Sequence, residues 1–329
     1  MIKKAKKKNY LGFLILALCL VAIVPMILGI WSLVSPQPSM ATDFSNVLAT
    51  ANVTSAPPVA SSVILRDANT FSETNIILNP SSTATVECLA TISDNNGCDD
   101  ITGVSAKIYR SGATPACLDD NNDCYTDAEC SVGGDCTSGG ADLDVSYTCN
   151  AALQFYADAT DTGPLSAQTW QCEVTPTDGV AGDPVVDATP PDVDSLPALT
   201  VLPTSIAYGE LALGGTSATS KQVVVTNVGN RSLDIYLKST ASTAMTCDIG
   251  TIPLANEKYH TTENFDFDTG GGVALTDEDV TLVLDLAAPT DDVDPVISDA
   301  TEWELRMPAT GVEGFCTGTN MFTVYADND

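Results

Sequence analysis

The residues best suited to chemistry lie in the eleven-residue stretch CLDDNNDCYTD (117–127), which holds two cysteines and four aspartates. Calcium is bound by six to eight oxygen atoms, which calcium loops supply from alternating positions. With Asp119 as the first position, the side chains of Asn121, Asp123 and Asp127 and the carbonyl of Tyr125 fall on the alternating positions that follow. The spacing therefore predicts calcium ligands at Asp119, Asn121, Asp123 and Asp127.

The same stretch departs from the EF-hand pattern at two places. Cys124 stands where the sharp turn requires glycine, and Cys130 stands where a bidentate glutamate closes the site, with Glu129 one residue early. No helical pattern flanks the loop. Two interpretations remain: a non-helical calcium turn, or an acidic surface loop braced by a disulfide. The missing glycine and glutamate favour the braced loop.

Enzyme chemistry finds little support elsewhere in the chain. His260 is the single histidine, and neither a Gly-x-Ser-x-Gly motif nor a glycine-rich phosphate loop occurs. Three tryptophans in 329 residues do not suggest the aromatic-lined cleft of a glycosidase. We therefore expect a protein that is not an enzyme.

Charge and hydropathy divide the chain at its start. A basic segment at 1–9 contains five lysines and precedes an apolar segment at 10–34, which is long enough to span a bilayer. All 43 acidic residues follow it, against only eight basic ones, which excludes nucleic acid as a partner. Lysines remain cytoplasmic, so the rest of the chain is expected outside the membrane. The apolar segment is either an uncleaved single-pass anchor or a secretion signal cleaved near Ala41.

Period-two alternation predicts the architecture beyond this segment. Residues 35–60 form a Ser/Thr/Pro-rich stalk, 61–187 a disulfide-rich sandwich, 188–199 a Pro/Asp linker and 200–329 a second sandwich. Short runs such as ATVECLATI and TWQCEV place apolar residues on one face. We expect an all-β protein of two Ig-like antiparallel β-sandwich domains following an N-terminal transmembrane or signal helix.

Residues 199–237 resemble the start of Ig-like modules of the ASH/MSP type, as found in prokaryotic cell-surface proteins. The resemblance rests on a Pro-x-Ser at Pro203, an aromatic-glycine pair at Tyr208, a Val/Thr strand, and the Asn-x-Gly turn from Asn227 to Gly229. It covers about forty residues, and it implies a scaffold or an interaction surface rather than catalysis.

The first domain is loosely similar to cystine-linked Ig-like domains, since Cys88 and Cys172 are expected to face inward on an early and a late strand, with Trp170 beside Cys172. That similarity implies a Cys88–Cys172 disulfide, although Cys149 is also in phase with Cys88. An exported chain keeps its cysteines oxidised. The remaining expected pairs in this domain are Cys117–Cys124, Cys130–Cys136 and Cys98–Cys149, and the second domain offers only Cys247–Cys316.

Two sequons mark Asn52 and Asn230 as candidate glycan acceptors. The features together favour a membrane-tethered surface protein with a structural or adhesive role, whose partners are the membrane through the N-terminal helix and other surface proteins or glycans. One alternative is a secreted subunit of a surface filament or surface layer, which self-associates when residues 47–53 add a strand to a neighbour. A second alternative is a calcium-dependent module that binds carbohydrate or protein, with calcium as the only expected cofactor.

Overall fold

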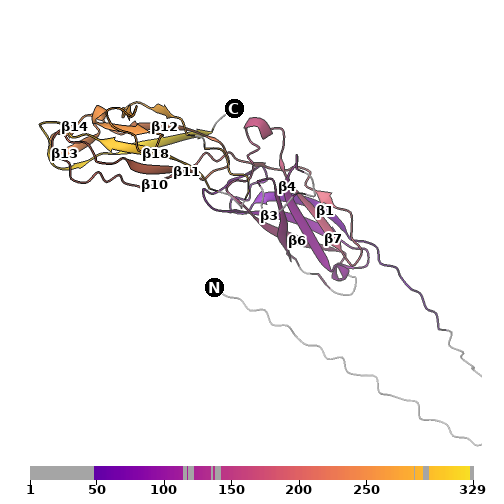
Figure 1. Ribbon diagram of the computed structural model, residues 1–329. Helices are drawn as coiled ribbons and strands as arrows, with labels where there is room; N and C mark the ends of the chain where they lie inside the picture. The colour runs from indigo at the N-terminus through magenta and orange to yellow at the C-terminus, as the bar shows by residue number, and fades with distance from the viewer. Residues whose placement is uncertain are drawn as a thin grey trace, which may run out of the picture. The chain divides into compact units, whose positions relative to one another are not determined.

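The computed structural model describes residues 48–113, 117, 122–134, 136–137, 142–284, 286–291 and 296–326, apart from the side chain of Asp127 (Figure 1). The expected membrane or signal segment lies outside these residues. Within the described ranges, no helix has the length and hydrophobicity needed to cross a membrane. Val53–Asp329 forms one compact unit.

The described chain is all-β, as the alternation predicted. It contains short 3-10 turns at Cys98–Asp100 (η1), Gly163–Leu165 (η2) and Leu254–Asn256 (η3). The strands are β1 (Val59–Asp67), β2 (Asn75–Ile76), β3 (Ala84–Ser93), β4 (Gly103–Arg110), β5 (Cys124–Val132), β6 (Asp144–Leu153), β7 (Trp170–Thr177), β8 (Val185–Val186), β9 (Asp192–Val193), β10 (Leu199–Leu202), β11 (Lys221–Asn227), β12 (Leu233–Ser239), β13 (Met245–Ile249), β14 (Thr251–Ile252), β15 (Glu257–His260), β16 (Val273–Ala274), β17 (Val280–Leu282), β18 (Ile297–Leu305), β19 (Glu313–Thr317) and β20 (Asn320–Ala326).

The compact unit has two hydrophobic cores, and we name the lobes after them. The N-terminal lobe (residues 53–197) packs β1 to β9, and the C-terminal lobe (residues 199–326) packs β10 to β20. The expected linker at 188–199 includes β9, which pairs in parallel with β2 of the N-terminal lobe, and the first residue of β10.

The N-terminal lobe is built on a seven-stranded sheet of order β1-β3-β6-β5-β4-β7-β8. Its β3 alternates as expected, with Val86, Cys88 and Ile92 fully buried. Three strands separate β3 from β7, which would place them about 19 Å apart in a flat sheet. The Cα atoms of Cys88 and Cys172 are nevertheless 6.2 Å apart. The sheet therefore folds over on itself, and the disulfide crosses the core.

The chain turns directly after β6 although its sequence continues to alternate. The run from Leu153 to Ala157 alternates like a strand, but β6 ends at Leu153 and the following residues turn. Leu153 and Ala157 are both fully buried, and the Ala157 amide donates to the Gln154 carbonyl. The turn buries Tyr156 while Phe155 is only partly buried, so the inward pattern differs from that of a strand.

The C-terminal lobe contains a five-stranded sheet of order β10-β11-β18-β15-β16 and two three-stranded sheets, β17-β12-β20 and β14-β13-β19. Trp303 on β18 is fully buried in the core of this lobe. The Trp303 ring contacts Tyr259 on β15 and Phe322 on β20, with ring centroids 5.5 and 6.3 Å away. Aromatic packing therefore connects two of the sheets.

The expected Asn-x-Gly turn follows β11. Asn227 is fully buried, and its side-chain amide donates to the carbonyls of Arg231 and Ala287 at 2.8 Å each. A Cβ on Gly229 would lie 1.8 Å from the Leu196 carbonyl oxygen. Glycine is needed there because the segment entering β10 passes directly over it.

Ten cysteines form five disulfides. Cys88–Cys172, Cys117–Cys124 and Cys247–Cys316 have the partners expected from the sequence. The other four differ from the expectation of Cys130–Cys136 and Cys98–Cys149, because the structure forms Cys130–Cys149 and Cys98–Cys136.

The register of the sheet explains this correction. Cys149 on β6 lies directly opposite Cys130 on β5, and paired residues of neighbouring strands point to the same face. Cys88 on β3 is the opposite neighbour of Cys149 but bonds across the core to Cys172 instead. Cys136, beyond the end of β5, is left to reach Cys98 in η1.

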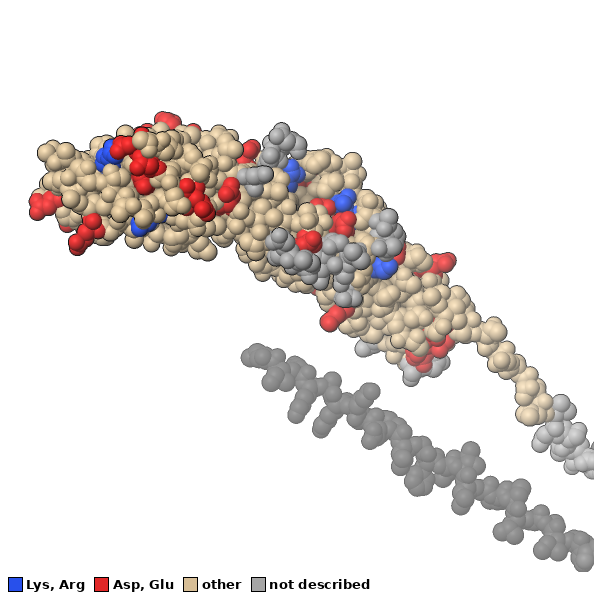
Figure 2. Space-filling view, viewed as in Figure 1, with Lys and Arg blue, Asp and Glu red and all other residues tan. Residues whose placement is uncertain are grey.

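Acidic side chains outnumber basic ones on the face shown in Figure 2, as the composition requires.

Candidate functional site

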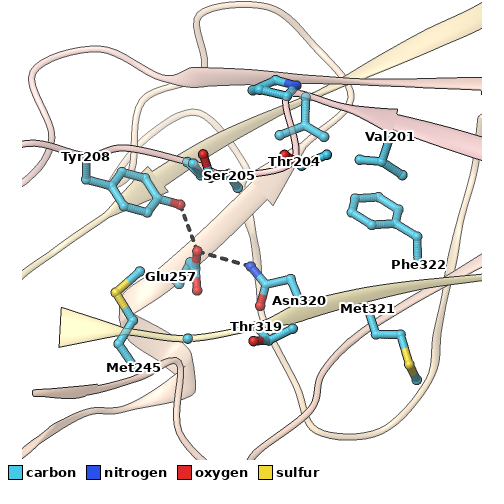
Figure 3. Close-up of a pocket in the computed structure, with 14 residues that line it drawn as sticks. Val201, Thr204, Ser205, Tyr208, Met245, Glu257, Thr319, Asn320, Met321 and Phe322 are labelled. Atoms are coloured by element: carbon cyan, nitrogen blue, oxygen red, sulfur yellow. Dashed lines mark hydrogen bonds between the residues drawn. The ribbon is translucent and has the colours of Figure 1, made fainter.

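The C-terminal lobe contains a cavity of about 440 Å³ (Figure 3). The segment after β10, the start of β15 and the start of β20 contribute its polar residues. Val201, Val223, Met245 and Phe322 give it apolar walls. A concave site that combines apolar walls with convergent polar groups is a usual form of a small-ligand site.

Glu257 is the central polar residue of this cavity. It opens β15 and is only 1% exposed. Its Oε1 accepts hydrogen bonds from the Tyr208 hydroxyl at 2.8 Å and the Asn320 amide nitrogen at 3.2 Å. Figure 3 shows Glu257 between these two residues.

Burial governs the electrostatics of the site. Loss of solvent raises the pKa of Glu257, and the hydrogen bonds from Tyr208 and Asn320 only partly oppose it. Burial also raises the pKa of the Tyr208 hydroxyl, and the neighbouring Glu257 carboxylate raises that pKa further. Tyr208 therefore stays a hydrogen-bond donor throughout the physiological range.

Two acceptor atoms of the site have no partner in the described part of the chain. They are Oε2 of Glu257 and Oδ1 of Asn320, and both are buried. An unpaired buried polar atom costs about 1–3 kcal/mol. A ligand that brings N–H or O–H donors to these two oxygens would recover that free energy, so the cavity is chemically suited to a donor-bearing group.

Glu257 and Tyr259 share a face of β15, since residues two apart in a strand point the same way. Tyr259 is 4% exposed and Glu257 lies beside it in the core. The sequence did not single out Glu257, because a charged residue usually marks an exposed position of a strand. The available signal was an acidic residue two positions before an aromatic one in a short β-prone run.

The predicted calcium loop is described only in part. Asp119, Asn121 and the side chain of Asp127 lie outside the described residues. The Asp123 carboxylate lies 3.5 Å from the guanidinium of Arg110, whose Nε is 2.7 Å from Asp158. Asp123 thus has a cationic neighbour, and calcium at this loop stays a prediction.

The same loop contacts both lobes. The Asn122 side chain donates to Asp158 at 2.7 Å, and the Asn122 amide donates to the carbonyl of Thr290 at 3.0 Å. Burial raises the pKa of Asp158, while Arg110 and Asn122 act against that rise. The loop therefore has a structural role in joining the lobes, which its sequence did not indicate.

Asn230 has a different role from the one its sequon suggested. Its side chain is 5% exposed and its amide nitrogen donates to the carbonyls of Ala157 at 2.8 Å and Asp194 at 3.1 Å, while its Oδ1 accepts from the Leu196 amide. A glycan on that nitrogen would replace one of the two donated hydrogens, so the fold gives Asn230 a structural role, and its glycosylation stays a prediction. Asn52 is exposed and stays a predicted acceptor.

His260 makes contacts typical of a structural residue. Its Nδ1 accepts a hydrogen bond from the Thr262 amide at 2.8 Å, and its ring stacks on Phe265 with centroids 5.8 Å apart.

Comparison with known proteins gives no family. No protein-family model matches the chain, and no curated protein is significantly similar to it. Solved structures similar to the chain include two described as the C-terminal domain of BspA, one named as an antigen I/II polypeptide of Streptococcus agalactiae. They are 13% and 12% identical, cover 80% and 82% of this chain and 96% of their own, and have TM-scores of 0.23 and 0.20. At these values the likeness carries no argument about function.

Proposed function

We propose that this chain is a non-enzymatic protein of the cell surface, tethered by its N-terminal segment, whose β-lobes have a structural or adhesive role. The proposal is supported by the lysine-flanked apolar segment at 1–34 and by ten cysteines joined in disulfides, which persist in oxidising compartments. The resemblance of residues 199–237 to ASH/MSP-type modules agrees with a scaffold role.

Protease treatment of intact cells tests the location. Surface exposure predicts that added protease removes the lobes while cytosolic markers survive, and that the recovered protein lacks free thiols. Recovery of an intact, thiol-reactive chain from the cytosol would overturn the proposal.

The Glu257 cavity is the binding site of this surface protein, and its ligand is an amine-bearing side chain of a partner protein. The single observation that carries this assignment is the unpaired Oε2 of a carboxylate that is 1% exposed. An ammonium group supplies three hydrogen-bond donors, and its positive charge balances the negative charge of an ionised Glu257. Its aliphatic stem fits the apolar walls formed by Val201, Met245 and Phe322.

Calorimetric titration with matched small molecules tests this assignment. Nα-acetyl-lysine amide should bind, whereas Nα-acetyl-norleucine amide, which has the same stem without the amine, should not. The variant Glu257→Gln should weaken lysine-amide binding at least tenfold because the charge partner is lost. Equal binding of both amides, or tighter binding of a methyl glycoside, would refute an amine ligand.

A second candidate function, a filament or surface-layer subunit, rests on the exposed segment before β1. Leu48 is 88% exposed and Val53 80% exposed, and neither has a place in the two cores. Such residues suit a strand donated to a neighbour. N-terminal sequencing of the protein from cells separates the two functions: a start near residue 42 supports donation, and an intact Met1 contradicts it.

A further inference from the structure

Three carboxylates meet at one end of the N-terminal lobe, away from the Glu257 cavity. Asp94 follows β3, Asp100 ends η1, and Asp178 follows β7. One carboxylate oxygen from each lies within 4.8 Å of the others. They converge because the segment before β4 pairs with the end of β7, where the Thr102 amide donates to the Thr177 carbonyl.

A cluster of acidic groups alone does not make a site, but Asp94 adds an independent observation. Its side chain is only 1% exposed, and its Oδ2 has no hydrogen-bond partner in the described chain. Its Oδ1 accepts from the Asn96 amide at 2.7 Å. Burying an unpaired carboxylate oxygen beside two further carboxylates is strongly unfavourable unless a cation compensates it.

The described residues around the cluster form no ion pair that would supply such a cation. None of the ion pairs formed by described residues involves Asp94, Asp100 or Asp178. The Ser55 hydroxyl lies 2.6 Å from Oδ2 of Asp178 and 3.2 Å from Oδ2 of Asp100. A hydroxyl has one proton, so it can donate to only one of these two oxygens. The cluster therefore needs positive charge as well as hydrogen bonds.

The backbone around Asp94 is shaped for this arrangement. Gly97 has φ 122°, which favours glycine, and its amide donates to the Asp94 carbonyl. The Asn96 side chain accepts a hydrogen bond from the Ala56 amide at 2.8 Å. Ser55 and Ala56 of the incoming stalk are thereby held against the cluster.

We propose that Asp94, Asp100 and Asp178 bind a calcium ion, with the Ser55 hydroxyl as a neutral oxygen ligand. All four groups offer oxygen, which calcium prefers, and no cysteine sulfur or histidine nitrogen that would favour zinc belongs to the cluster. Opposite oxygens around calcium are separated by up to about 5 Å, so the observed spacing accommodates the ion. The bound ion would fasten the end of the stalk to the lobe.

Calcium titration of the full chain, monitored by calorimetry and by melting temperature in 150 mM NaCl, tests the site. Saturating calcium should raise the melting temperature by about 5–10 °C at a hundredfold excess over Kd, relative to EDTA. Asp94→Asn should weaken calcium binding at least tenfold while the chain still folds, because the amide preserves the shape of the carboxylate. Ser55→Ala should weaken it by a smaller factor.

The matched control is the double variant Asp119→Asn, Asp127→Asn in the loop at 117–127. It should keep full calcium affinity if the ion binds at Asp94. Loss of binding in this variant, with retention in Asp94→Asn, would overturn the proposal in favour of the loop. No calcium-induced shift in the parent chain, or an equal shift in parent and Asp94→Asn, would also overturn it, since a diffuse acidic surface would respond equally in both.

Discussion

The two lobes differ in how many disulfides they contain and in where those disulfides lie. The N-terminal lobe has four disulfides, and one of them crosses its core between β3 and β7. The C-terminal lobe has one disulfide at its β13–β19 edge. Both lobes bury a tryptophan against a tyrosine, Trp170 with Tyr125 and Trp303 with Tyr259. The disulfides of the N-terminal lobe therefore add covalent bracing to an apolar core and do not replace one.

The lobes also differ in how they treat a buried carboxylate. In the C-terminal lobe, Glu257 lies in a cavity and receives two hydrogen bonds on one oxygen. In the N-terminal lobe, Asp94 lies among other carboxylates at the end of the sheet. The first environment suits a donor-bearing organic group, and the second suits a metal ion.

The largest expected effect on stability comes from removing the disulfide that crosses the core of the N-terminal lobe. Replacing both Cys88 and Cys172 with alanine should lower the free energy of unfolding by about 5 kcal/mol, because an 84-residue loop loses its closure and two fully buried sulfurs leave the core. Hydrogen exchange during urea unfolding should show β3 and β7 opening before β11 and β18.

The corresponding alanine pair at Cys247 and Cys316 serves as its control. This bridge joins directly paired residues at a sheet edge, and Cys316 is only partly buried. We expect a loss of about 3 kcal/mol, confined to the C-terminal lobe. A larger loss of unfolding free energy than for Cys88 and Cys172 would show that the edge disulfide stabilises its lobe more than the disulfide that crosses the core.

A middle-sized effect concerns the contact between the lobes. Asn230→Ala removes three hydrogen bonds that connect the segment before β12 to the N-terminal lobe, and the one to the Ala157 carbonyl is buried. We expect a loss of about 2–3 kcal/mol and a broader unfolding transition. Circular dichroism in urea measures both. The exposed Asn79, whose side chain donates to the Thr83 carbonyl, gives a matched Asn79→Ala control that should change stability by less than about 0.5 kcal/mol.

The smallest expected effect is a pH-dependent change in stability caused by Glu257. Because burial raises its folded pKa above the ordinary value of 4.5, its stabilising contribution is complete below pH 4.5 and is lost as pH rises through the folded pKa. Glutamine mimics the protonated acid, so Glu257→Gln should exceed the parent in stability by about 1–2 kcal/mol at neutral pH and match it near pH 4. Melting curves from pH 4 to 8 measure the difference; a pH-independent difference would show that Glu257 is not the titrating group.

The local sequence was sufficient to predict which side chains of a single strand are buried. The alternation of Trp170, Cys172 and Val174 in TWQCEV, and of Val86, Cys88 and Ile92 in ATVECLATI, predicted buried faces that the structure confirms. The physical reason is that side-chain direction in a strand repeats every two residues whatever the strand pairs with.

Tertiary structure alone decided everything that depends on which strands are neighbours and in which register. Cys149 pairs with Cys130 only because β5 adds to β6 at that register, and Asp178 reaches Asp94 only because β7 ends beside the segment that precedes β4. Such contacts join residues 19 to 84 positions apart, and no local pattern selects among the alternatives. The acidic loop at 117–127 drew attention by composition, whereas the burial that distinguishes Asp94 and Glu257 is imposed only by the folded chain.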